Sequence, residues 1–439
     1  MEQLAAIVWG PQLMVLMLAV GIVMTVRTGW VQVRKWKQTV RILRKPAGRR
    51  GVTPFQAVCT ALAGTVGTGN IAGVSGALAL GGPGAVFWMW VSAFFGMATK
   101  YAEVVLALRY RKKDTAGQWL GGPMYYISEG MGARRLAAGF ALFALAGSLA
   151  MGNVAQVHTV ADGVKTAAAI WLPRWSSRSA ALAAGVAAAV IVVVATMGGM
   201  GRIGRIMESA MPVLAGAYIL GSAAVLATHH TKILPAFRQI LQGAVAPRAV
   251  IGGAAGISLR QAVRWGVSRG VFSNEAGLGS APMAHAAAEA EPEEQGLLGV
   301  FEVFFDTIVL CTLTALTILV SGVPIPYGEA AGAELTTAAL ETVFGKSASL
   351  MQAVILTFLA LGSMISWNLY GSRCAHYLWG YGGERVYQLV FPAVTLLGAT
   401  MDLSAAWTLA DLCNGLMALP NLIALLVLQK QAAPQRSDR

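Results

Sequence analysis

The chain has 439 residues, of which 56% are hydrophobic and only 12% are charged. This composition excludes an ordinary soluble domain and predicts an all-α polytopic membrane protein, with the lipid bilayer as a partner. The net charge is +13, but the basic residues fall in short runs between apolar segments. That distribution is typical of cytoplasmic loops and gives no reason to expect nucleic acid as a partner.

The first apolar segment, about residues 4–26, is predicted to span the bilayer. A loop with nine basic residues and no acidic residue follows it, up to residue 53. The positive-inside rule places this loop in the cytoplasm and the N-terminus outside. Residues 1–53 therefore form an extra N-terminal helix with a basic cytoplasmic loop.

The second apolar segment, about residues 54–80, contains glycine at positions 64, 67, 69 and 73. Because each glycine in a helix costs roughly 1 kcal/mol relative to alanine, the helix is predicted to break around Gly67 to Asn70. Unwound backbone is tolerated in a bilayer only where it lines a cavity in the protein, so the break predicts a binding site. Close helix packing through Gly69 and Gly73 is the alternative interpretation.

Four more spans complete a first five-helix repeat, residues 54–228: about 87–108, 136–160, 180–197 and 206–227. Residues 121–127 are aromatic and too short to span, so we expect them to lie at the cytoplasmic membrane surface. Residues 229–256 are expected to form an extracellular loop with short helices.

A second repeat, residues 257–428, begins with the least hydropathic candidate, about residues 257–288. Spans at about 297–320, 350–377, 386–400 and 407–428 follow, with an outer loop at about 324–347. The tail, residues 429–439, is expected in the cytoplasm. The total is about eleven helices, and interrupted segments at corresponding positions of two halves predict an inverted-repeat transporter with its substrate held at the midplane.

Several motifs resemble the sodium:alanine symporter family, also called the alanine or glycine:cation symporters. The motifs are Gly81-Gly82-Pro83-Gly84-Ala85-Val86-Phe87-Trp88-Met89-Trp90, Gly122-Pro123-Met124-Tyr125-Tyr126-Ile127, Asn153-Val154-Ala155-Gln156 and Phe272-Ser273-Asn274-Glu275-Ala276-Gly277-Leu278-Gly279-Ser280-Ala281-Pro282. The resemblance covers most of the chain and implies a LeuT-type fold, with five plus five inverted helices preceded by the extra one.

An amino-acid substrate brings a carboxylate and an ammonium. Free amides from Gly69 onward lie at the positive end of a half-helix dipole and suit the carboxylate. By resemblance, Thr68 and Gly69 contact the substrate. We expect the opposite wall from Phe272, Asn274 and Gly277, whereas ordinary packing is an equal alternative for Phe272. The resemblance adds Gln156, for which interhelical hydrogen bonding competes, and Trp367.

A sodium site is expected where the inner half-helix ends, because its unpaired carbonyl groups can coordinate a small cation. Its carbonyl ligands are expected at Ala63, Thr65 and Val66. The resemblance implies that Asn70 also binds an ion, although capping of the broken backbone is equally compatible with an asparagine there.

The eighth core helix departs from the family pattern. Related chains usually read Thr-Thr-Ile-Ile-Gly-Trp followed by Tyr-Gly-Glu, whereas residues 362–367 read Gly-Ser-Met-Ile-Ser-Trp and residue 372 is serine. One hydroxyl expected at the sodium site is therefore missing at Gly362. Ser363 or Ser366 must replace it, which predicts weaker sodium binding or a different coupling ion.

Four charged residues in the predicted spans need explanation, since an intramembrane charge is costly unless it is paired. For Glu275 we expect a structural role, with Arg264, Arg269 or helix capping as its partner. Asp306 is either functional or the partner of an arginine. Lys100 and Glu103, at i,i+3 spacing, are expected to neutralise each other.

These observations predict a symporter that imports alanine or glycine with sodium by alternating access, located in a bacterial inner membrane. It is not expected to be an enzyme, because no nucleophile, base or metal-ligand spacing is evident, and no cofactor is expected. The alternatives are a proton-coupled transporter, with Asp306 or Glu275 as the proton carrier, and a non-transporting amino-acid-binding membrane protein.

Overall fold

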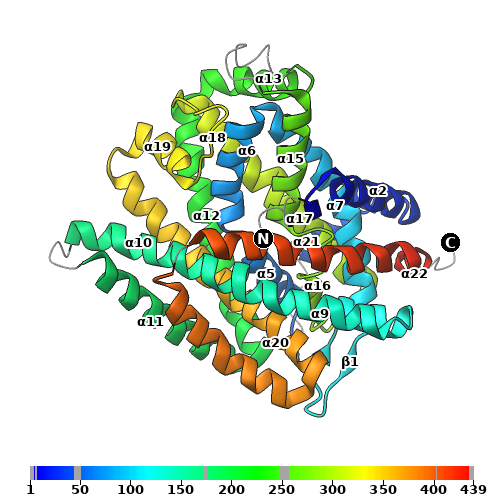
Figure 1. The fold of residues 1–439 in the computed structure, drawn as a ribbon. Helices are drawn as coiled ribbons and strands as arrows, with labels where there is room; N and C mark the ends of the chain where they lie inside the picture. Colours follow the sequence, from blue (N-terminus) through cyan, green and yellow to red (C-terminus); the bar gives the residue numbers. More distant parts are fainter. Residues whose placement is uncertain are drawn as a thin grey trace.

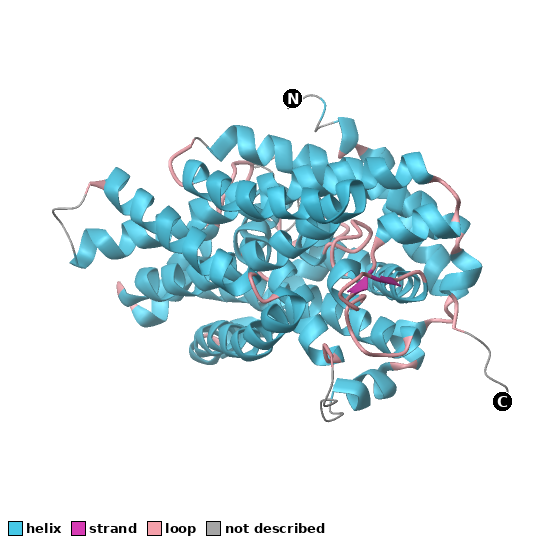
Figure 2. Ribbon diagram, turned by 90° about the horizontal axis from the view of Figure 1, so that it is seen from below, coloured by secondary structure: helices cyan, strands magenta, loops and turns pink. Residues whose placement is uncertain are grey.

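The computed structural model describes residues 4, 7–43, 51–171, 176–246, 257–401 and 403–434. Apart from one short hairpin, all regular elements in this part of the chain are helices (Figure 2). Seven of these helices are long and apolar enough to cross a membrane, or eight if one bent pair is counted as a single span. The all-α polytopic fold is thus confirmed, whereas the total of eleven spans stays a prediction.

The first half of the chain forms the elements expected of it, with shifted bounds. They are α2 (Pro11–Arg27), α3 (Val31–Arg34), α4 (Trp36–Leu43), α5 (Pro54–Thr65), η1 (Gly69–Gly73), α6 (Val74–Gly81), α7 (Gly84–Arg109), α8 (Pro123–Tyr125), η2 (Tyr126–Gly130), α9 (Arg134–Leu149), η3 (Ala150–Val154), α10 (Ala155–Trp171), α11 (Ser177–Thr196), α12 (Gly199–Thr228), η4 (His230–Lys232) and α13 (Ile233–Gly243). The short helix α13 lies in the predicted external loop, of which residues 247–256 fall outside the described part.

The second half has the same kind of interrupted helices. They are α15 (Leu259–Asn274), α16 (Pro282–His285), α17 (Pro292–Val303), η6 (Phe304–Cys311), α18 (Thr312–Ser321), α19 (Ala333–Phe344), α20 (Ser347–Gly398), α21 (Leu403–Val427) and α22 (Gln429–Ala432). The long α20 contains two of the predicted spans, which meet at the non-helical residue Gly380.

Both broken helices begin with the same capping device. At the start of α5, Thr53 Oγ1 accepts a hydrogen bond of 3.1 Å from Gln56 N, and Gln56 Oε1 accepts one of 3.1 Å from Thr53 N. At the start of α15, Ser258 and Gln261 exchange the equivalent pair at 3.3 and 2.7 Å. Each box satisfies amides that the first helical turn leaves free, so the two corresponding segments start in the same way.

The helices form two packed groups (Figure 1). In the first group, α15 and α17 pack on α7, next to the broken helix α5–α6. In the second group, α9, α10 and α11 pack on α20. Helix α12 contacts α5 and α18 of the first group and α20 of the second, so it joins the two.

A hairpin that the sequence analysis did not predict, β1 (Lys112–Lys113) and β2 (Trp119–Leu120), follows α7. It lies at the opposite end of the molecule from α13 and α19 (Figure 1). Arg111 Nη1 donates to the carbonyl oxygen of Ala286 at 3.0 Å, and Tyr381 Oη donates to Asp114 Oδ2 at 2.9 Å. The hairpin thus ties the link after α16 to the kink in α20.

The aromatic segment at residues 121–127 is not at the membrane surface, and that prediction is wrong. All seven residues are buried. Gly122 has φ +135°, and the Cβ of any larger residue there would lie 2.6 Å from Met283 Cγ. The segment therefore packs inside the protein beneath the second helix break.

Candidate functional site

The first break lies at Val66 and Gly67, slightly earlier than predicted. Helix α5 ends at Thr65, Val66 has extended dihedral angles, and the chain resumes as the π-helical turn η1, with α5 and α6 bent by 53°. Gly67 N does not continue the helical pattern but donates to Asn70 Oδ1 at 2.9 Å. Asn70 thus caps the broken backbone, which was one of its two predicted roles.

The second break runs from Glu275 to Ala281. Glu275 adopts the left-handed conformation with φ +53°, and Gly277 and Gly279 have φ of +93° and +82°. Asn274 Oδ1 accepts a hydrogen bond of 3.0 Å from Ala276 N, so an asparagine side chain caps this break as well. Such positive φ angles suit glycine, which explains two of the glycines in this motif.

The turn η6 joins the two breaks. Asp306 Oδ1 accepts a hydrogen bond of 2.7 Å from Asn70, and its Oδ2 accepts one of 2.7 Å from Ser273 and one of 2.9 Å from Thr307. Asn274 Nδ2 in turn donates to Thr307 Oγ1 at 3.0 Å. The partners of Asp306 are therefore Asn70 and Ser273, next to the two breaks, and its neighbour Thr307, and not an arginine.

A cavity of about 780 Å³ opens beside the first break. It brings together three of the predicted substrate-binding residues, Thr68, Gly69 and Phe272, together with Ala72 and Gly73. Gly69 packs tightly, because a Cβ there would lie 3.3 Å from Ser273 Cα. The small residues of η1 thus let it pack closely on α15 and leave the cavity beside them unfilled.

Other predicted substrate-binding residues do not line this cavity. The amide of Gly277 donates to Glu103 Oε1 at 3.1 Å and its carbonyl oxygen accepts from Asn421 Nδ2 at 2.9 Å, so both backbone groups have protein partners. Gln156 and Trp367 are buried, at 4% and 0% exposure, and Gln156 Oε1 and Trp367 Nε1 have no hydrogen-bond partner in the described part of the chain. Buried polar atoms of this kind are uncommon and require an explanation.

A charged pair of residues at the cavity was not predicted from the sequence. Arg269 and Asp411 both line it, from α15 and α21. The Arg269 guanidinium lies 5.7 Å from the centre of the Phe272 ring and 5.2 Å from that of Trp265. The i,i+3 spacing of Arg269 and Phe272 on one helix face was the available signal, whereas the sequence offered Arg269 as one of three alternative partners of Glu275.

The predicted cation ligands lie where α20 meets α5. Ser363 Oγ donates to the carbonyl oxygen of Ala63 at 3.0 Å, and Ser366 Oγ donates to that of Thr60 at 2.8 Å. Thr65 Oγ1 bonds back to its own helix, at Leu62 and Ala61. The oxygens of Ala63 and Ser363 are thus close together beside the break, as a cation site between these helices requires.

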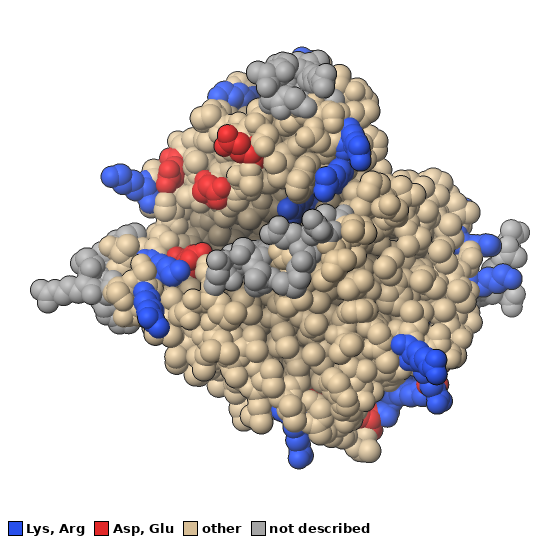
Figure 3. Space-filling model, in the orientation of Figure 1, with Lys and Arg blue, Asp and Glu red and all other residues tan. Residues whose placement is uncertain are grey.

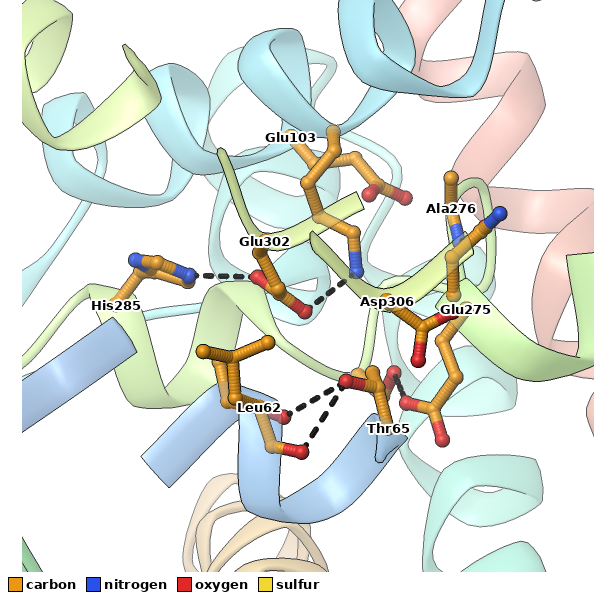
Figure 4. Close-up of polar contacts among 12 residues, drawn as sticks. Leu62, Thr65, Glu103, Glu275, Ala276, His285, Glu302 and Asp306 are labelled. Carbon is orange, nitrogen blue, oxygen red and sulfur yellow. Dashed lines mark hydrogen bonds and ion pairs between the residues drawn. The ribbon is translucent and has the colours of Figure 1, made fainter. Parts of the chain in front are cut away.

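A group of buried charges lies below the second break. Figure 4 shows the side chains of Glu103, Glu275, Glu302 and Asp306 between α7 and the end of α5. All four are fully buried. Among the described residues, the bases in this group are Lys100 and His285. Lys100 Nζ lies 3.3 Å from Glu302 Oε1, and His285 Nε2 lies 2.9 Å from Glu302 Oε2.

The pairing in this group differs from the predictions. Lys100 pairs with Glu302 and not with Glu103, which instead accepts from Gly277 and Asn421. Glu275 accepts a hydrogen bond from Ser280, not from an arginine. Its Oε1 has no partner among the described residues, and neither has Glu103 Oε2. Helix packing brought together residues far apart in sequence, which spacing along one helix cannot reveal.

On the face shown in Figure 3, the broad surface over α9 and the adjoining part of α10 is nearly free of charged side chains, whereas the outer end of α10 carries Asp162 and Lys165. A membrane protein with two broken helices linked to each other beside a cavity has the arrangement that is typical of secondary transporters.

The comparisons agree with this class. The profile of the sodium:alanine symporter family matches residues 1–438, and the chain belongs to that family. It is 40% identical over 432 residues to the sodium/alanine symporter AgcS of Methanococcus maripaludis, covering 96% of this chain and 92% of the relative. It is 37% identical to the probable sodium/glutamine symporter GlnT of Bacillus subtilis, covering 97% and 87%.

The fold is similar to that of MhsT, solved in complex with L-phenylalanine. The TM-score is 0.63 at 12% identity, covering 89% of this chain and 94% of the other. The LeuT-type fold expected from the sequence is thereby confirmed. Membership of the sodium:alanine symporter family confirms the assignment to transporters, which are not enzymes.

Proposed function

We propose that the chain is a symporter that imports a small neutral amino acid, alanine or glycine, together with sodium by alternating access. The observation that carries this proposal is the meeting of the two helix breaks, held by Asp306, beside a cavity lined by Thr68, Gly69 and Phe272.

The substrate carboxylate is assigned to the amides at the start of η1, from Gly69 onward, because they lie at the positive end of a half-helix. Phe272 lines the cavity and limits the size of the side chain. Gln156 and Trp367 do not line it in the state described, so their contact with the substrate requires a conformational change. Gln156 Oε1, which has no partner among the described residues, is then available to the ammonium group. The cavity itself is larger than alanine needs, so we assign its wider part to entry, beneath Arg269 and Asp411.

Sodium is assigned to the space between α5 and α20, with the carbonyl oxygens of Ala63 and Val66 and the hydroxyl of Ser363 as ligands. In the state described, Ser363 donates to Ala63; ion binding requires that hydroxyl to turn its oxygen inward. Thr65, Asn70 and Ser366 have other partners here and are assigned to supporting roles. The ion orders the broken helix, so ion and substrate affinities are reciprocally linked.

The test is accumulation of radiolabelled alanine and glycine in proteoliposomes. With an inward sodium gradient the protein should concentrate one or both, and replacement of sodium by choline should abolish accumulation. Undiminished uptake in choline would refute sodium coupling. Glutamine is the matched competitor, because a relative carries that name; glutamine uptake without alanine or glycine uptake would refute the substrate assignment.

Proton coupling is the second candidate, favoured by the excess of buried carboxyl groups over bases around Glu275. Lys100, Glu103, Glu302 and Asp306 are the charged groups that surround it. A buried carboxyl with one unpartnered oxygen is more stable in its protonated form. Under this alternative, uptake in choline is driven by an inward pH gradient and is lost in Glu275→Gln.

A non-transporting amino-acid-binding protein is the third candidate, which saturable binding without accumulation would identify.

We further propose a bacterial inner-membrane location, with the N-terminus outside and the C-terminus in the cytoplasm. This orientation places α19 and the cavity mouth outside. Labelling of single cysteines introduced at Lys346 and Lys112, at opposite ends of the molecule, with an impermeant reagent tests it, because only the cysteine at 346 should react from outside.

A further inference from the structure

A second large hollow lies on the outer surface of α12, away from the candidate site. Its volume is about 900 Å³, and it is lined by Arg202, Arg205, Ile206, Val213, Leu214 and Phe358. Its walls come from α12 and, through Phe358, from α20. Phe358 and Val213 are 52% and 69% exposed, so the apolar part of this groove is open to the surroundings of the protein.

The charge in the groove is at one end only. Arg202 and Arg205 are exposed residues in the first two turns of α12, at i,i+3 spacing on one helix face. No described residue forms an ion pair or hydrogen bond with either guanidinium group. The next acidic residue, Glu208, is turned toward α5, where its carboxylate accepts a hydrogen bond of 2.9 Å from Gln56. Two cationic groups are therefore free to bind an anion.

The length of the groove fits one leaflet of a bilayer. From Arg202 to Leu214 an α-helix rises by about 18 Å. The hydrocarbon core of one leaflet is about 15 Å thick, half of the usual 30 Å. A groove with two guanidinium groups at one end and only apolar side chains beyond Ser209 thus matches a headgroup and its acyl chain.

We propose that this groove binds one anionic phospholipid. The headgroup phosphate pairs with Arg202 and Arg205, and an acyl chain lies along Ile206, Val213 and Phe358. Arginine is well suited to the phosphate because its planar guanidinium donates two parallel hydrogen bonds. Arg202 and Arg205 lie at the predicted cytoplasmic end of α12. Anionic lipids are concentrated in the cytoplasmic leaflet, and basic pockets between helices on that side bind their headgroups.

The position of the groove gives the lipid a structural consequence. Helix α12 contacts both groups of helices, and the groove is formed where it passes α20. A lipid that contacts both walls stabilises this arrangement of α12 on the second group. Pro212 lies in the same stretch of α12 and has no backbone N–H, so one helical hydrogen bond is missing there. By itself, α12 is therefore less stable in this region.

The test uses the full chain purified in detergent, titrated with phosphatidylglycerol or phosphatidylcholine of identical acyl chains. Native mass spectrometry counts the bound lipids, and the melting temperature reports stabilisation. We expect one phosphatidylglycerol to bind preferentially and to raise the melting temperature. Arg202→Gln/Arg205→Gln should weaken this binding about 30-fold, since each basic residue near a membrane surface contributes about 1 kcal/mol.

Two further variants make the result specific. Val213→Trp keeps both charges but fills the groove, so it should weaken binding of both lipids. Arg134→Gln/Arg135→Gln removes the same charge from exposed residues at the start of α9 and should bind like wild type. Equal binding of the two lipids by wild type, wild-type binding by Arg202→Gln/Arg205→Gln, or an equal loss in the α9 control would each overturn the proposal. Sodium-driven uptake is measured separately and does not enter this test.

Discussion

The side-chain amide of Asn70 donates a hydrogen bond of 2.7 Å to Asp306 Oδ1, across 236 positions of the chain. Its carbonyl oxygen at the same time accepts from Gly67 N. One asparagine therefore both caps the first helix break and fastens it to η6, which also holds Ser273 at the second break. Movement of either break is coupled to Asp306.

Asp306→Ala should destabilise the protein strongly. It removes the carboxylate acceptor of the Ser273 and Thr307 hydroxyl groups, whereas Asn70 Nδ2 keeps Ser273 Oγ and the Asp306 carbonyl oxygen. Each buried donor left unsatisfied costs about 1 to 3 kcal/mol. Asp306→Asn keeps one acceptor oxygen, so its melting temperature should lie between those of Asp306→Ala and wild type. The melting temperature in detergent is the measurement, and an unchanged value for Asp306→Ala would show that the network does not hold the breaks.

Gly362→Ser should increase the apparent affinity for sodium. A Cβ at position 362 would lie 3.6 Å from Ala63 Cβ and 4.0 Å from the carbonyl oxygen of Ala63, so a hydroxymethyl group fits without displacement and adds the hydroxyl oxygen that the family pattern leads us to expect there. The measurement is the sodium concentration for half-maximal alanine uptake. Gly139→Ser, on a helix face with no atom within 4 Å, is the control for helix propensity. No change, or weaker sodium dependence, would remove this position from the ion site.

Gly69→Leu should abolish substrate binding while membrane insertion remains normal. The Cβ alone approaches Ser273 Cα to 3.3 Å, and Phe272 Cδ1 lies 3.7 Å away, so the added side chain either fills the cavity or separates η1 from α15. Gly216→Leu, on an open face of α12, is the matched control. Binding of labelled alanine to the purified proteins distinguishes them, and wild-type binding by Gly69→Leu would place the substrate elsewhere.

Lys100→Met should destabilise the protein by about 3 to 5 kcal/mol, because the buried Glu302 carboxylate then loses the ammonium group that it pairs with. Replacing both residues, Lys100→Met/Glu302→Leu, should recover part of the loss, although His285 then lacks its acceptor. The free energy of unfolding of the two single variants and the double variant gives the coupling. A coupling of zero would mean that the two side chains act independently.

The hairpin contact at Asp114 should not depend on pH between 5 and 8. Partial burial by itself raises the pKa of Asp114, but hydrogen bonds from Gln118 N, Tyr381 Oη and Ala116 N outweigh it and hold that pKa below its ordinary 3.8. A carboxyl group whose pKa is lower in the folded than in the unfolded protein stabilises the fold at every pH above its unfolded pKa. This stabilisation is lost only as the pH falls through the lower, folded-state pKa.

Hydrogen exchange of residues 112–120 is the measurement for this contact. After correction for intrinsic rates, protection should be constant over that pH range and should fall in Asp114→Ala. Protection that already decreases near pH 6 would point to another titrating group at the hairpin.

Sequence alone determined the class of this protein, because membrane insertion depends on composition and on local patterns. Apolar runs of membrane length, basic loops and the glycines at 64, 67, 69 and 73 are all local features, and they predicted the all-α membrane fold and the first break. The family, and with it the LeuT-type fold, was predicted from the resemblance of four short motifs. The second break was also foreseen, since its polar, glycine-rich segment cannot form an ordinary lipid-facing helix.

Only the tertiary structure decided which polar groups meet. Lys100 was assigned to Glu103 by helical spacing, yet it pairs with Glu302, 202 positions away. Arg269 was one of the partners considered for Glu275, yet it lines the cavity with Asp411. Partners of a buried charge are chosen by the packing of helices, where distance in space is independent of distance along the chain. The sequence thus specified where the helices break, and the packing of α7, α15 and η6 decided what each break contacts.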